Sequence, residues 1–162
     1  MPALRLAALT LLFSGCTFGL DVLGDAPPAQ GAGWREMLDE VNAVRARGRY
    51  CGETYFPAAP PLVWNGRLET AARRHSEDMA RTGRFSHTGS DGSTPGERAS
   101  RAGYDWRRVA ENIARNQHSV QQVVRDWAGS PGHCANLMNA SYIEIGAAEV
   151  NRHWTQVLGR PR

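Results

Sequence analysis

Residues 127–137, with the sequence Trp-Ala-Gly-Ser-Pro-Gly-His-Cys-Ala-Asn-Leu, restrict the fold more than any other part of this chain. A helix is expected to end at Gly129 and Pro131, because glycine and proline both terminate helices. His133 follows this predicted turn, and Cys134, one of only three cysteines, lies next to it. A histidine held between a helix end and a disulfide would be rigid, which suits a functional site as well as a tight corner.

The N-terminus has the pattern of an export signal over residues 1–15. Arg5 supplies the positive charge, and the apolar run at residues 6–13 is too short to span a membrane as a stable helix. Ser14-Gly15 before Cys16 resembles a lipobox, although Phe13 stands where a lipobox usually has leucine. Cys16 would then carry a lipid that anchors the protein to the membrane. Ordinary signal cleavage nearby is the alternative.

The other two cysteines are expected to form a disulfide. Removing Cys16 from the count leaves Cys51 and Cys134, an even number in a chain that is predicted to be exported. Closing so long a loop would stabilise the fold by roughly 4 kcal/mol through chain entropy. Two free thiols are the alternative. The composition of residues 16–33 indicates a flexible tether, and residues 34–162 are expected to form one domain.

The pattern of apolar residues and caps predicts an α+β domain with several helices around a small, mostly antiparallel sheet. Asn65 is expected to cap a helix that ends at Gly83, and further caps are predicted at Thr94 with Glu97 and at Ser119 with Gln122. Two strands near the C-terminus are expected to meet in a tight hairpin at Asn151-Arg152, and residues 50–61 are expected to be a loop.

Charge argues against nucleic acid as a partner. The formal net charge is +3, and all 19 basic residues are arginine. A bias in the base composition of the source genome explains this use of arginine more simply than phosphate recognition does. These arginines are interspersed with 16 acidic residues and form no basic run.

The candidate site residues are His87, Glu111, Ser130 and His133. Both histidines are expected on loops, and Glu111 lies between apolar neighbours, so it is predicted to be partly buried and to need a partner. Two imidazoles and a carboxylate could bind zinc or another divalent cation, or could transfer protons with Glu111 as the base and a histidine as the acid. His75, on the apolar face of its helix, is interpreted as a hydrogen-bonded core residue.

Four segments in this order resemble the CAP superfamily of cysteine-rich secretory, antigen 5 and pathogenesis-related proteins, in particular bacterial exported SCP-domain proteins. They are Phe85-Ser86-His87, Ala110-Glu111-Asn112-Ile113, the run from Trp127 to His133, and Tyr142-Ile143-Glu144-Ile145-Gly146 with Trp154-Thr155-Gln156-Val157; the helix at His75 to Ala80 supports them. The resemblance covers about residues 34–159. It implies a three-layer α-β-α sandwich with a central cleft.

In this superfamily the cleft carries two histidines and, in the fullest form, two acids. His87 and His133 match the histidines and would be the metal ligands, and Glu111 matches the first acid. The second acid would fall near Ser130, where this chain has no carboxylate. The activities that the resemblance implies include sterol or fatty-acid binding, divalent-ion binding and proteolysis.

The function expected from these observations is that of an exported, non-enzymatic binding module at the bacterial cell envelope, either lipid-anchored through Cys16 or secreted. Its cleft would bind a divalent metal or a small lipid ligand, and the protein is expected to be a monomer. One alternative is a metal-assisted hydrolase that acts on a peptide or an envelope polymer, with Glu111 as the candidate catalytic residue. Another is a structural scaffold with a vestigial site.

Overall fold

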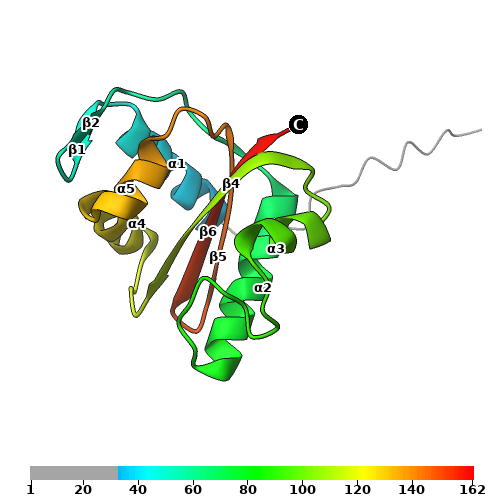
Figure 1. The fold of residues 1–162 in the computed structure, drawn as a ribbon. Helices are drawn as coiled ribbons and strands as arrows, with labels where there is room; N and C mark the ends of the chain where they lie inside the picture. Colours follow the sequence, from blue (N-terminus) through cyan, green and yellow to red (C-terminus); the bar gives the residue numbers. More distant parts are fainter. Residues whose placement is uncertain (1–32) are drawn as a thin grey trace, which may run out of the picture.

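The computed structural model describes residues 33–162, and the predicted signal peptide, Cys16 and the tether up to residue 32 lie outside them. The described chain forms a four-stranded sheet between two groups of helices (Figure 1). The helices are α1 (Gly33–Arg45), α2 (Gly66–Thr82), α3 (Pro95–Arg101), α4 (Val120–Gly129) and α5 (Pro131–Met138). The strands are β1 (Arg49–Cys51), β2 (Thr54–Phe56), β3 (Val63–Trp64), β4 (Trp106–Arg115), β5 (Glu144–Val150) and β6 (His153–Pro161).

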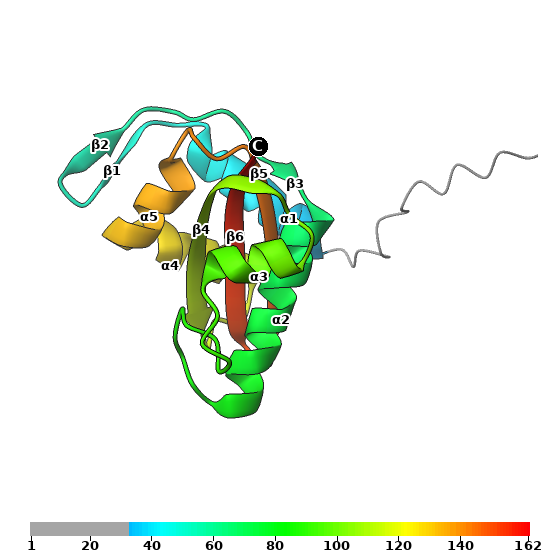
Figure 2. The same ribbon diagram turned by 45° about the vertical axis from the view of Figure 1, so that its right-hand side comes forward.

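The central sheet has the strand order β3-β5-β6-β4 and is mostly antiparallel, as predicted (Figure 2). β6 pairs antiparallel with both β4 and β5, whereas the short β3 pairs parallel with β5. Asn151 and Arg152 form the two-residue turn between β5 and β6, with φ angles of 49° and 60°. Two consecutive positive φ angles match the right-handed twist of the hairpin, so this prediction is confirmed.

The two helical layers bury separate apolar clusters. α1, α4 and α5 cover one face of the sheet, where Val41, Trp127 and Leu158 belong to the larger cluster. α2 and α3 cover the other face, where Leu68 and Val157 lie in a smaller cluster. The predicted three-layer α-β-α arrangement is therefore confirmed. None of the described helices is both long and apolar enough to cross a membrane.

α2 packs unusually close to the sheet at Gly146 in β5. A Cβ atom added at Gly146 would clash with the backbone of Leu68 and Glu69 in α2. The missing side chain therefore lets the helix backbone rest directly on the strand.

Local capping signals position the helices as predicted. The Asn65 side chain accepts hydrogen bonds from the backbone N–H groups of Arg67 and Leu68, and Gly83 ends α2 with a φ of 69°. Thr94 and Glu97 form the predicted capping box at the start of α3. Ser119 caps α4, but the Gln122 side chain accepts from the N–H of His118, one residue before the predicted donor.

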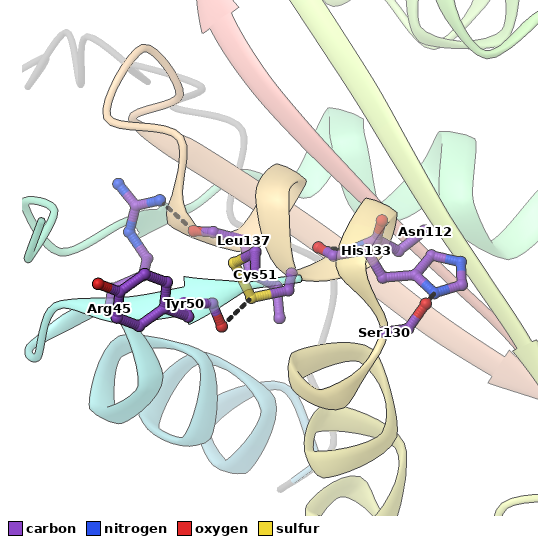
Figure 3. Close-up of a disulfide and its surroundings, with 8 residues drawn as sticks. Arg45, Tyr50, Cys51, Asn112, Ser130, His133 and Leu137 are labelled. Atoms are coloured by element: carbon purple, nitrogen blue, oxygen red, sulfur yellow. Dashed lines mark hydrogen bonds between the residues drawn. A yellow bond between two sulfur atoms is a disulfide. The ribbon is translucent and has the colours of Figure 1, made fainter. Parts of the chain in front are cut away.

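Residues 50–61 contain a small hairpin, so the loop predicted there is wrong in part. β1 and β2 pair antiparallel around Gly52, whose φ of 64° suits the turn. The predicted disulfide joins Cys51 in this hairpin to Cys134 in α5, with a Cα–Cα distance of 5.4 Å (Figure 3). The hairpin is thereby fixed to the helix that also carries His133.

Candidate functional site

Glu111 lies at the centre of the candidate site. It is on β4, and its side chain is only 1% exposed. Its Oε2 accepts a hydrogen bond of 2.6 Å from Arg98 Nη2, and its Oε1 lies 2.9 Å from His87 Nδ1. The predicted partial burial of Glu111 and its need for a partner are both confirmed. The paired guanidinium offsets the loss of hydration that a carboxylate suffers on burial.

Arg98 connects this carboxylate to the loop that carries His87. The guanidinium, on α3, also donates to the backbone carbonyls of His87 at 3.0 Å and Ser93 at 2.7 Å. Arg98 is 8% exposed and Glu111 is 1% exposed, so their ion pair lies in a region that excludes most water. The additional hydrogen bonds of Arg98 offset the cost of removing the ion pair from water. Through them, Arg98 also holds the carboxylate of Glu111 and the loop of His87 in fixed positions.

His87 is oriented by Glu111 and still reaches solvent. Its side chain is 52% exposed, and a carboxylate can only accept, so Nδ1 carries the hydrogen that is shared with Glu111. Nε2 is then the nitrogen with a free lone pair. A histidine held by a carboxylate in this way is the usual arrangement behind a metal ligand or a general base.

His133 lies within α5, so its predicted position on a loop is wrong. Pro131 does not end the helical region; it occupies the first turn of a new helix, where its missing N–H leaves no hydrogen bond unmade. His133 Nδ1 lies 3.0 Å from Ser130 Oγ (Figure 3). Burial lowers the pKa of His133, and the neighbouring charge of His87 lowers it further. Both causes favour the neutral imidazole of His133.

Side-chain amides fix α5 against β4 beside these histidines. Asn112 Nδ2 donates to the His133 carbonyl at 3.3 Å, and Asn136 donates to Asn112 Oδ1 at 2.8 Å (Figure 3 shows the first of these contacts). Asn136 also donates to the Glu111 carbonyl at 3.4 Å. The helix with His133 and the strand with Glu111 are thus held in one register.

His75 lies behind the site as a hydrogen-bonded core residue, which confirms its interpretation. Its Nε2 is 2.9 Å from the Ser86 carbonyl and 3.7 Å from Glu111 Oε1. Burial is the largest cause of its lowered pKa. Because a carbonyl only accepts, Nε2 carries the hydrogen, and His75 holds the backbone next to His87.

The structure therefore joins His87 directly to Glu111 and His133 directly to Ser130, as two hydrogen-bonded pairs. The residue that sequence reasoning missed is Arg98. The only signal was the unmet need of Glu111 for a partner, and a chain with 19 arginines gives many choices. A cavity of about 510 Å³ lies between α3 and β4, and Glu111 forms part of its wall together with Glu97, Arg101 and Trp106.

The donor set restricts which cation the site could hold. Within residues 33–162, no group of three or more His, Cys, Asp or Glu side chains is arranged to bind a metal ion. Both oxygens of Glu111 are engaged, which leaves the imidazoles of His87 and His133 as the available ligands. Zinc sites in proteins usually have three or four protein ligands. Two imidazoles are fewer protein ligands than such a site has.

Comparison with known proteins now identifies the family. The profile of the cysteine-rich secretory protein family, CAP, matches residues 38–156. The chain belongs to the CAP family. A curated CAP relative, the uncharacterized protein YkwD of Bacillus subtilis (strain 168), is 28% identical over 133 residues, or 81% of this chain and 48% of YkwD. The chain thus spans about half the length of this relative.

Solved structures agree with the CAP fold. An extracellular protein containing an SCP domain from Bacillus anthracis str. Ames superposes with a TM-score of 0.70 and 26% identity, over 79% of this chain and 40% of that chain. An outer surface protein of Borrelia burgdorferi gives a TM-score of 0.61 at 19% identity, over 79% and 89% of the two chains. The first neighbour is described as extracellular, in agreement with the export expected for this CAP protein.

Proposed function

We propose that this CAP protein is an exported binding module of the bacterial cell envelope, and that His87 and His133 present two imidazole nitrogens to a divalent cation. The bond between Glu111 and His87 carries the proposal, because it leaves Nε2 of His87 as a fixed lone pair, while Asn112 and Asn136 hold the helix with His133 beside the same strand. Water or a polar group of a small ligand would complete the coordination. When bound, the cation would supply an electrophilic contact for that ligand.

The contacts of Glu111 favour binding over hydrolysis. A general base must accept a proton from a substrate or from a water molecule within hydrogen-bond reach. One oxygen of Glu111 accepts from Arg98 and the other accepts from His87, and the side chain is 1% exposed. Its role in this proposal is therefore to orient His87, and no catalytic step is assigned to it.

Zinc titration by calorimetry tests the proposal. We expect the exported protein to bind one zinc ion and the variant His87→Ala/His133→Ala to lose this binding. The matched control is His118→Ala/His153→Ala, which removes the same number of imidazoles from outside the site and should bind as the wild type does. Glu111→Gln should weaken binding by about 10- to 100-fold, because residues behind a metal ligand typically contribute that much to affinity.

Two outcomes would contradict the proposal. Zinc affinity that is unchanged in the His87→Ala/His133→Ala variant would exclude the histidine pair as the site. Absence of zinc binding in the wild type would favour a scaffold role, or a lipid ligand that needs no metal. The lipid anchor at Cys16 is a separate part of the proposal, and mass spectrometry of the mature N-terminus would decide between an acylated Cys16 and ordinary cleavage.

A further inference from the structure

Among residues 33–162, the edge of the sheet opposite the histidine site has backbone groups without a strand partner. β3 pairs only with Glu144 and Ile145 of β5, and the chain then enters α2 at Gly66. Within the described residues, β5 from Gly146 to Val150 therefore has a neighbouring strand on the β6 side only. Such a free edge can pair with an additional strand.

The register shows which backbone groups face this edge. Asn65 N–H donates to the Ile145 carbonyl at 2.8 Å, so Ile145 directs its backbone toward the β3 side. Backbone groups alternate along a strand, so Ala147 and Glu149 direct their N–H and C=O groups to the same side. These groups lie on the same side of β5 as β3, beyond its end, and no strand in the described part of the chain pairs with them.

A groove follows this free edge. It has a volume of about 470 Å³, and it lies between α1 and α2 with Ala147–Val150 along its floor. Trp34 and Trp64 stand at one end, with ring centroids 5.8 Å apart, and both are only partly buried. A volume of this size lies within the roughly 300 to 1,000 Å³ of typical binding pockets.

The charge of the groove is negative, although the whole chain carries +3. Glu69 is paired with Arg73 at 2.6 Å, so these two charges offset each other. Glu77 and Glu149 are exposed in the groove wall, and neither takes part in an ion pair among residues 33–162. Their two carboxylates favour a cationic occupant.

We propose that this groove binds an extended, basic peptide segment of a partner protein, which adds as a strand to the free edge of β5. The backbone groups of Ala147 and Glu149 would supply the main-chain hydrogen bonds, and alternate side chains of the peptide would meet the tryptophans and the carboxylates. The chain's own residues 17–32 suit the groove less well, because they contain Asp21 and Asp25 and no basic residue. The site is independent of the histidines, which lie beside β4 at the other edge of the sheet.

Peptide binding measured by fluorescence anisotropy tests this proposal. The protein is the exported chain with Cys16→Ser, which releases it from any membrane anchor. The probe is a labelled hexapeptide of alternating lysine and valine, and we expect saturable binding at low salt. The same peptide with glutamate in place of lysine should bind at least about fivefold more weakly, since each ion pair is replaced by a repulsion. Full N-methylation of the lysine peptide should weaken binding at least about tenfold, because it removes the backbone donors.

Variants of the protein locate the binding site. Glu77→Gln and Glu149→Gln should each weaken the lysine peptide by about two- to fivefold, as expected for exposed ion pairs. Glu53→Gln removes an exposed carboxylate on the β1–β2 hairpin and should leave the affinity unchanged.

Several results would overturn the proposal. These are absence of saturable binding, equal affinity for the lysine and glutamate peptides, and undiminished binding of the N-methylated peptide. Binding that requires removal of residues 17–32 would identify that segment as the occupant instead. Sedimentation as a dimer that the lysine peptide dissociates would identify a second copy of the chain.

Discussion

Replacing Arg98 by methionine is the sharpest test of how the histidine site is held together. The substitution keeps an unbranched apolar stem but removes the guanidinium that contacts Glu111 Oε2 at 2.6 Å. Glu111 is 1% exposed and would lose this partner in a position that excludes most water. Breaking a buried ion pair by removing one partner costs about 3 to 5 kcal/mol. Since small domains have a total stability of about 5 to 15 kcal/mol, we expect Arg98→Met to remove roughly a fifth of it or more.

The double variant Arg98→Met/Glu111→Leu separates the buried charge from the loss of packing. It removes both members of the pair, so no unpartnered carboxylate remains in the buried position. Replacing both partners of a buried pair by apolar residues is often close to neutral. We therefore expect the double variant to be more stable than Arg98→Met by about 2 kcal/mol, a difference within the range of coupling energies for residues in contact.

Urea unfolding followed by tryptophan fluorescence measures these differences, since the chain contains five tryptophans and the disulfide stays intact. The matched control is Arg101→Met, on the same helix, which breaks an ion pair with Asp91 in which both side chains are more than half exposed. Its free energy of unfolding should remain close to that of the wild type. If Arg98→Met were no more destabilising than Arg101→Met, the argument that Arg98 supports a buried charge would be refuted.

Two further predictions concern stability. The Cys51–Cys134 bond closes a loop with a sequence separation of 83, so its removal should lower the free energy of unfolding by up to about 4.5 kcal/mol on chain entropy alone. Thermal melts of the protein with and without reductant measure this effect. Coincident melting curves would contradict it. Burial lowers the pKa values of His75 and His133 in the folded protein. As the pH falls below about 6.5, these two histidines are therefore protonated in the unfolded chain before they are protonated in the folded one. The free energy of unfolding should therefore be highest above this pH and decrease below it, and His75→Phe should reduce the decrease; a urea midpoint that stays constant from pH 7.5 to 5.5 would count against this reasoning.

The predictions from sequence were most accurate where the signal lies within a few residues. Asn65 caps α2 through bonds to residues two and three positions away, and Thr94 and Glu97 complete a capping box across one helical turn. The Asn151-Arg152 turn closes a hairpin between adjacent strands in the same way. Such contacts depend on local backbone geometry, and local sequence is sufficient to specify them.

Predictions failed where two local outcomes were equally compatible with the sequence. Pro131 can end one helix or begin the next, and only the packing of α5 against β4 selects the second. Likewise, residues 49–56 carry a weak strand signal, and a disulfide to a helix 83 positions away stabilises the hairpin that they form.

By itself, the sequence determined the α+β class, the caps of α2 and α3, the hairpin turn at Asn151-Arg152 and the burial of Glu111. Only the tertiary structure decided that Arg98, 13 positions away, neutralises Glu111, and that Glu111 then orients His87 from 24 positions away. It also decided that β3 ends too early to cover the edge of β5. The physical reason is that a buried charge requires a partner but does not specify which one, so the choice depends on which side chains the packed layers bring within hydrogen-bond distance.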